Sequence, residues 1–163
     1  MNEDLLEIIR DVHNFFIGKG LTLSVAESCT GGLVSHYMTT LPGASTFFQA
    51  GVVTYSNISK ITILGLSSAD IEKYGVVSDT AAREMAEKVR VLLRTDYGLA
   101  ATGNLGPEAL EGKEKGLVYI AVSASGRTVG KELRLTGDRA YNKEQAAFWA
   151  LKLLLETAKG VGS

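Results

Sequence analysis

The chain has 163 residues, of which 45% are hydrophobic, 21% are charged and one is cysteine. This length predicts one domain over residues 1–163 with a buried core, and the composition is globular rather than disordered. A formal net charge of −1 gives no basis for a nucleic-acid or anionic-membrane surface. One cysteine excludes an internal disulfide, and no apolar run reaches the ~20 residues of a membrane span. The acidic start is unlike a signal peptide. We therefore expect a cytoplasmic protein.

The first half of the chain alternates helical and strand patterns. Apolar residues at helical spacing, ended by glycine or proline, predict helices over 3–18, about 31–40, 57–64 and 67–74 and a long helix after the N-cap Ser78. Residues 21–26 alternate apolar and polar side chains, and residues 49–55 are similarly strand-like. Each predicted strand in this half is therefore followed by a helix, as in α/β proteins.

The second half is richer in strands. A nearly continuous apolar run over residues 97–102 predicts a strand buried on both faces, and residues 117–125 and 128–136 predict an antiparallel hairpin. A polar loop over 103–116 precedes the hairpin, and a helix over 140–159 follows it. This order of elements predicts an α/β fold, a three-layer α/β/α sandwich on a mixed, partly parallel sheet. In such folds, sites gather where strand ends meet loops.

The stretch Leu21–Gly32, LTLSVAESCTGG, is a candidate reactive turn because it joins a predicted strand to a predicted helix. Ser28 within it could be a nucleophile if a base lies within hydrogen-bond reach. Lys60 could be that base if desolvation lowers its pKa, since only the neutral amine accepts a proton. Tyr55, at a strand end near Lys60, could relay a proton or orient the lysine.

Other interpretations of these residues stay open at this level. Ser28 could simply cap a helix, and Lys60 could be a solvated surface side chain. Cys29 could be the nucleophile instead, because a helix N-terminus lowers a thiol pKa. The Thr30–Gly32 turn could cradle a phosphate without any catalysis, which would make the chain a nucleotide-binding module.

Two further turns carry candidate substrate contacts. Thr102 and Gly103 end the buried strand, where a hydroxyl can meet a ligand. Arg139, at the start of the last helix, could bind a phosphate through its forked donors, whereas Asp138 is better explained as a helix N-cap. The sequence contains no zinc-ligand spacing and no Walker or GxGxxG pattern, so we expect neither a metal nor another cofactor.

Several motifs in series resemble one family. They are AESCTGG (26–32), PGAS (42–45), GVVTYSNISK (51–60), GVVS (75–78), ATGNLGP (101–107), GLVYIAV (116–122) and TGDR (136–139). Their order is similar to that of the CinA C-terminal domain family, over about residues 4–158. The family includes bacterial nicotinamide mononucleotide deamidases, which hydrolyse the carboxamide to nicotinate mononucleotide and ammonia with a Ser/Lys dyad and without a metal.

The resemblance implies roles for individual residues. The dyad would be Ser28 and Lys60, with Tyr55 as the tyrosine of the same segment. Substrate contacts would come from Thr30, Gly31, Gly32, Ser45, Thr102, Gly103 and Arg139. The expected partner is a small nucleotide substrate, and a homo-oligomer is compatible with the apolar helices. The chain also resembles a stand-alone form, without the molybdopterin-binding-like domain of longer members.

The loop over 103–116 departs from the family pattern. It reads GNLGPEALEGKEKG, with Asn104 and Leu105 where a small apolar pair is usual and no Gly-Gly after Pro107. If this loop contacts substrate, the affinity or the substrate itself could differ. A pyridine-nucleotide-binding domain without hydrolase activity, or an amidase that uses Cys29, is therefore an alternative expectation.

Overall fold

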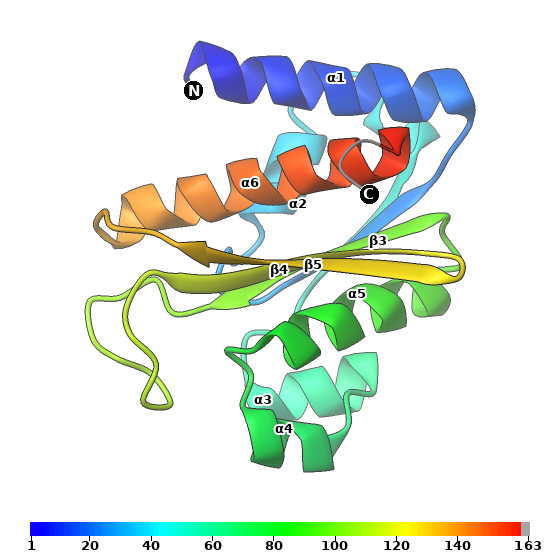
Figure 1. The fold of residues 1–163 in the computed structure, drawn as a ribbon. Helices are drawn as coiled ribbons and strands as arrows, with labels where there is room; N and C mark the ends of the chain where they lie inside the picture. The colour runs from blue at the N-terminus through cyan, green and yellow to red at the C-terminus, as the bar shows by residue number, and fades with distance from the viewer. Residues whose placement is uncertain (161–163) are drawn as a thin grey trace.

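The computed structural model describes residues 1–160, and its centre is one mixed sheet of five strands in the order β2-β1-β3-β4-β5 (Figure 1). The strands are β1 (Leu23–Glu27), β2 (Phe48–Val53), β3 (Tyr97–Gly103), β4 (Leu117–Ala124) and β5 (Arg127–Arg134). Strand β1 runs parallel to both β2 and β3, whereas β4 is antiparallel to β3 and β5. The sheet is therefore mixed, as the order of elements predicted.

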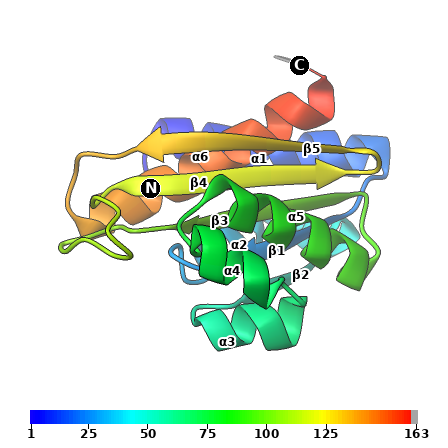
Figure 2. The same cartoon turned by 60° about the horizontal axis from the view of Figure 1, so that its bottom comes forward.

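Helices cover both faces of this sheet (Figures 1 and 2). One layer contains α1 (Glu3–Lys19), α2 (Leu33–Met38) and α6 (Arg139–Lys159). The other layer contains α3 (Asn57–Ser59), the π-helical turn η2 (Lys60–Leu64), α4 (Ser68–Tyr74) and α5 (Asp79–Leu93). A short 3-10 turn, η1 (Ala44–Thr46), precedes β2. The predicted three-layer α/β/α sandwich is confirmed. No helix in the described part of the chain is long and apolar enough to cross a membrane.

The two faces of the sheet are packed differently. Large side chains such as Val25 and Leu99 join the core under α1, α2 and α6. Their neighbours Ala26 and Ala100 point the other way, into the core under α5. A Cβ atom on Gly98 would lie 2.1 Å from the Ala86 carbonyl oxygen, so α5 can approach the sheet this closely only over a glycine. Small residues therefore bring the α5 layer close to the central strands.

Local signals set the helix ends. The side chains of Ser78 and Asp138 accept hydrogen bonds from the third residue of α5 and α6, which confirms both predicted N-caps. The helix predicted over 31–40 begins only at Leu33 because Gly31 and Gly32 have left-handed backbone, with φ of 58° and 102°. The carboxyl ends of β1, β2 and β3 lie side by side, and the residues that follow them form the site.

Candidate active site

Ser28 follows the last residue of β1. Its main-chain N–H donates to the Ala101 carbonyl oxygen at 3.0 Å, which continues the pairing of β1 with β3 by one residue. Because side chains alternate along a strand, Ser28 points to the same face as Ala26, toward the α5 layer. The side chain is buried. The strand thus presents one hydroxyl to the helical layer that contains Lys60.

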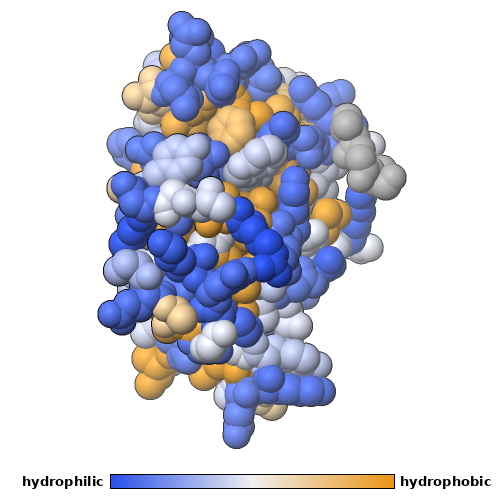
Figure 3. Space-filling model, turned by 60° about the vertical axis from the view of Figure 1, so that its left-hand side comes forward, coloured by the Kyte–Doolittle hydropathy of each residue, from blue (hydrophilic) through white to orange (hydrophobic). Residues whose placement is uncertain are grey.

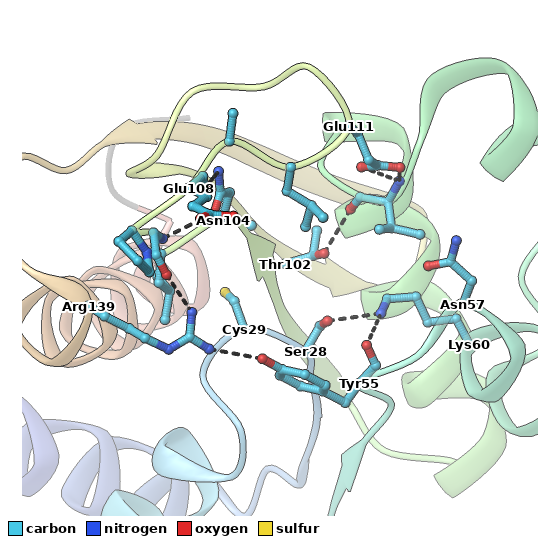
Figure 4. Close-up of a pocket in the computed structure, with 17 residues that line it drawn as sticks. Ser28, Cys29, Tyr55, Asn57, Lys60, Thr102, Asn104, Glu108, Glu111 and Arg139 are labelled. Carbon is cyan, nitrogen blue, oxygen red and sulfur yellow. Dashed lines mark hydrogen bonds between the residues drawn. The ribbon is translucent and has the colours of Figure 1, made fainter.

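Lys60 lies on the short helical segment that follows β2. Ser56 and Ser59 form a reciprocal capping box that starts this segment, and the chain continues as the π turn η2. The side chain has no exposed surface. Its Nζ atom lies 2.8 Å from Ser28 Oγ and 2.8 Å from the Thr54 carbonyl oxygen (Figure 4). The structure brings the two residues together, although 32 positions separate them in the sequence.

Burial changes the protonation of Lys60. Desolvation lowers the pKa of its ammonium group to about 8, against opposing effects from Cys29 and then from the Glu111 carboxylate. A neutral amine has two N–H groups and one lone pair. The carbonyl oxygens of Thr54 and Tyr55, at 2.8 and 3.4 Å, can only accept hydrogen bonds. The lone pair of neutral Lys60 is therefore left to accept the Ser28 hydroxyl proton.

Cys29 is also close to these groups, but it is poorly suited to nucleophilic attack. Burial, with a smaller contribution from the Glu27 carboxylate, raises the pKa of its thiol to about 12. The thiolate, which is the reactive form, is then almost absent near neutral pH. A helix N-terminus could have lowered the thiol pKa, but desolvation outweighs that effect here. This argues against the Cys29 alternative.

Glu27 explains the conformation of the reactive turn. The side chain is fully buried and folds back onto the start of α2. Its two carboxylate oxygens accept hydrogen bonds from the Thr30 hydroxyl, from the Val34 and Ser35 main-chain N–H groups and from the Ser35 hydroxyl, at 2.7–3.0 Å. A carboxylate of the protein itself thus fills the anion-binding position at this helix N-terminus.

The phosphate cradle expected at Thr30–Gly32 is therefore not formed toward the cavity. Thr30, Gly31 and Gly32 do not line it, and the Lys143 Nζ atom lies 3.3 Å from the position of a Cβ on Gly31. Ser45 lies in η1, is exposed and is also outside the cavity lining. None of these four predicted substrate contacts lines the cavity.

Tyr55 and Arg139 mark the other end of the site. The Arg139 guanidinium donates to the Tyr55 phenolic oxygen at 2.9 Å and to the Gly106 carbonyl oxygen at 2.7 Å. Figure 4 shows the Tyr55 side chain between Arg139 and the Ser28–Lys60 pair. It is the main-chain carbonyl of Tyr55, rather than its phenol, that contacts Lys60. Arg139 keeps further N–H groups that can bind an anion.

These residues surround a cavity of about 510 Å³, within the size range of small-molecule sites. Its lining includes Ser28, Cys29, Tyr55, Lys60, Thr102, Gly103, Arg139 and most of the loop after β3. Gly103 has a structural reason to be glycine, because a Cβ atom there would lie 2.7 Å from the Leu117 carbonyl oxygen. Figure 3 shows the face on which this loop projects as largely hydrophilic, with apolar side chains scattered among the polar ones.

The loop 104–116 forms one wall of the cavity and is held by hydrogen bonds within it and to neighbouring segments. The buried Asn104 side chain accepts from the Gly106 N–H and donates to the Glu108 carbonyl oxygen. The Glu111 carboxylate accepts from the main-chain N–H groups of Val76 and Val77, at 2.9–3.1 Å. Sequence reasoning missed Asn57, Val76 and Glu111 as cavity residues, since only tertiary contacts bring these segments together.

Metal ligands were not expected. Within residues 1–160, no three His, Cys, Asp or Glu side chains lie close enough together to hold an ion. The cavity lining offers a hydroxyl, a buried amine and a guanidinium for chemistry.

Comparisons with known proteins identify the family. The model of the CinA C-terminal domain matches residues 6–158. A protein of Alkaliphilus oremlandii named as competence-damage inducible is 44% identical over 153 residues, which are 93% of this chain and 37% of that protein. A CinA-like protein of Dictyoglomus thermophilum is 50% identical over 122 residues, 74% of this chain and 30% of that one. The chain thus spans about a third of the length of these relatives.

Solved structures agree with the fold. The crystal structure of the competence/damage inducible protein CihA from Agrobacterium tumefaciens has a TM-score of 0.92 at 31% identity, with 98% of each chain covered. The competence damage-inducible protein A from Klebsiella pneumoniae has a TM-score of 0.92 at 29% identity, covering 95% of this chain and 97% of that one. By its sequence and its fold, the chain belongs to the CinA C-terminal domain family.

Proposed function

We propose that this protein is an amidohydrolase that converts the carboxamide of nicotinamide mononucleotide, or of a closely related nucleotide, to the carboxylate and ammonia. The observation that carries the proposal is the 2.8 Å contact between Ser28 Oγ and the fully buried Lys60 Nζ at the wall of a cavity. Membership of the CinA C-terminal domain family supports it.

In the acylation step, Ser28 Oγ attacks the carboxamide carbon and its proton passes to neutral Lys60. The carbonyl oxygen becomes an oxyanion, which main-chain N–H groups of the following turn would stabilise. The Gly31 N–H already donates to the Ser28 carbonyl oxygen at 3.0 Å. The N–H group of Cys29, a residue that lines the cavity, is the better candidate.

The C–N bond then breaks, and the Lys60 ammonium returns its proton to the departing nitrogen, so that ammonia leaves. A water molecule attacks the resulting ester with Lys60 again as the base, which releases the carboxylate and restores Ser28. The pKa of about 8 suits both roles, because the amine and the ammonium are both populated near neutral pH.

Arg139 would hold the phosphate of the substrate. Its guanidinium is oriented by Tyr55 and by the Gly106 carbonyl, and it lies across the cavity from Ser28 (Figure 4). Tyr55 separates the two ends of the site, so the nucleotide would extend along its ring with the carboxamide at Ser28. This arrangement replaces the phosphate cradle expected at Thr30–Gly32.

The proposed function is tested by incubating the protein with nicotinamide mononucleotide and measuring ammonia and nicotinate mononucleotide. Stoichiometric formation of both products supports it. Calorimetric binding of the nucleotide without any ammonia release would instead favour a nucleotide-binding domain without hydrolase activity.

A further inference from the structure

Thr102 stands directly beside the proposed nucleophile. Strands β1 and β3 are parallel and pair Glu27 with Ala101, so the next residue of each chain segment, Ser28 and Thr102, is also a neighbouring pair. Adjacent strands lie about 4.8 Å apart, and paired residues of parallel strands point to the same face. Both side chains line the cavity, and only 1% of Thr102 is exposed. A substrate group attacked by Ser28 must therefore come close to the Thr102 hydroxyl.

The proton of the Thr102 hydroxyl is already used in a hydrogen bond within the protein. Thr102 Oγ1 donates to the Val76 carbonyl oxygen at 2.7 Å, and a carbonyl cannot donate in return (Figure 4). Val76 is itself fixed, because the Glu111 carboxylate binds the main-chain N–H groups of Val76 and Val77. A hydroxyl has one proton and two acceptor lone pairs. Toward the cavity, Thr102 Oγ1 can consequently act only as an acceptor.

From this geometry we propose that Thr102 selects a carboxamide over a carboxylate or an ester, by accepting a hydrogen bond from the substrate –NH2 group. The proposal rests on the proposed function and names a specificity determinant of the same site. A carboxamide offers N–H donors, whereas a carboxylate or an ester of the same shape offers only lone pairs. A buried acceptor facing another acceptor is left unpaired, and such sites discriminate strongly against analogues that lack the donor.

The same asymmetry acts on the product. Once ammonia has left and water has resolved the ester, the group beside Thr102 is a carboxylate. Its oxygens face the lone pairs of Thr102 Oγ1 and cannot supply a proton at neutral pH. Thr102 thus binds the substrate more tightly than the product, which limits product inhibition.

A binding experiment tests this without any turnover. In a Ser28→Ala background, calorimetry should show nicotinamide mononucleotide binding at least tenfold more tightly than nicotinate mononucleotide. Adding Thr102→Val, which keeps the shape but removes the acceptor, should bring the two affinities within about threefold of each other. Equal affinities before the Thr102 substitution, or an unchanged preference after it, would overturn the proposal, whether or not the wild-type protein releases ammonia.

Kinetics on the active protein separates specificity from a merely structural role. The matching methyl ester of nicotinate mononucleotide has the same reacting carbon but no N–H. Thr102→Val should lower the ratio of kcat/KM for the amide to that for the ester by roughly 10- to 100-fold. Thr102→Ser, which restores the hydroxyl, should return the ratio to within about threefold of wild type. If Thr102→Val lowered kcat/KM equally for the amide and the ester, the role of Thr102 would be only to hold the Val76 carbonyl in place. That result would refute the inference.

Discussion

The Nζ atom of Lys60 lies 2.8 Å from the Oγ atom of Ser28, and no part of the lysine is exposed. Neither a solvated surface lysine nor a simple helix-capping serine is compatible with this contact. Because burial lowers the lysine pKa and two main-chain carbonyls occupy its N–H groups, the neutral amine is directed at the hydroxyl. The following predictions depend on this pair and on the groups around it.

The first prediction concerns the pH dependence of kcat/KM, which reports on the free enzyme. The pKa of Lys60 is lowered to about 8, so roughly one lysine in ten is neutral at pH 7. Below pH 8, kcat/KM for the amide should fall about tenfold per pH unit. Initial rates between pH 5.5 and 9 measure this, and a flat profile down to pH 6 would be incompatible with Lys60 as the base.

Lys60 should also make the fold less stable at neutral pH. The pKa of its ammonium group is about 8 in the folded protein and 10.5 as the ordinary value. The penalty for burying the charge is thus fully present below pH 8 and is lost as the pH rises toward 10.5. At pH 7, Lys60→Met should therefore raise the free energy of unfolding by roughly 3 kcal/mol more than it does at pH 10.5.

Urea denaturation of wild type and Lys60→Met at both pH values measures that difference, in which all other titrating groups cancel. Lost hydrogen bonds to Ser28 and to the main chain reduce the gain equally at each pH, so the comparison isolates the Lys60 proton. A stability difference that does not vary with pH would show that folding does not lower the pKa of Lys60.

Arg139 should determine affinity for the phosphate. Arg139→Lys removes the planar fork that reaches both Tyr55 and Gly106, and we expect KM for nicotinamide mononucleotide to rise about tenfold with a smaller change in kcat. The corresponding nucleoside, which has no phosphate, should be affected little. Arg83→Lys, at an α5 arginine outside the cavity lining, is the matched control. Parallel losses on nucleotide and nucleoside would argue against phosphate binding by Arg139.

Glu111 should hold the loop 104–116 against the segment before α5. Glu111→Ala leaves the N–H groups of Val76 and Val77 without their acceptor and should lower the free energy of unfolding by about 1 kcal/mol. Because the loop is a cavity wall, KM should rise as well. Glu108→Ala removes a carboxylate from the same loop but keeps the main-chain carbonyl that accepts from Asn104, and should leave thermal stability unchanged. Equal melting temperatures for both variants would contradict the docking role of Glu111.

Much of the fold is predictable because its signals are local. Ser78 and Asp138 lie at the starts of α5 and α6, and apolar periodicity separates strands from helices along nearly the whole chain. The main error in the first half is the start of α2, which two left-handed glycines delay to Leu33. Such backbone conformation is compatible with the sequence but is not dictated by it.

The site is predictable only where a residue lies at a strand end or on the segment that follows it. Ser28 and Thr102 lie at strand ends, Lys60 and Arg139 lie on the helical segments that follow β2 and β5, and all four line the cavity. Glu27 and Ser28 are neighbours in the chain and their side chains point to opposite faces, and the periodicity gives no indication that the Glu27 carboxylate turns back to cap α2. The contact of Glu111 with Val76 spans 35 positions and follows from the path of a loop without periodicity.

Ammonia release from nicotinamide mononucleotide by the wild type, Ser28→Ala and Cys29→Ser tests the central claim most directly. We predict turnover by the wild type, at least a ~1,000-fold loss in Ser28→Ala and retention of most activity in Cys29→Ser, whose thiol has a pKa of about 12 in the wild type. Retained activity in Ser28→Ala together with its loss in Cys29→Ser would contradict the assignment of Ser28 and Lys60 as the reacting pair.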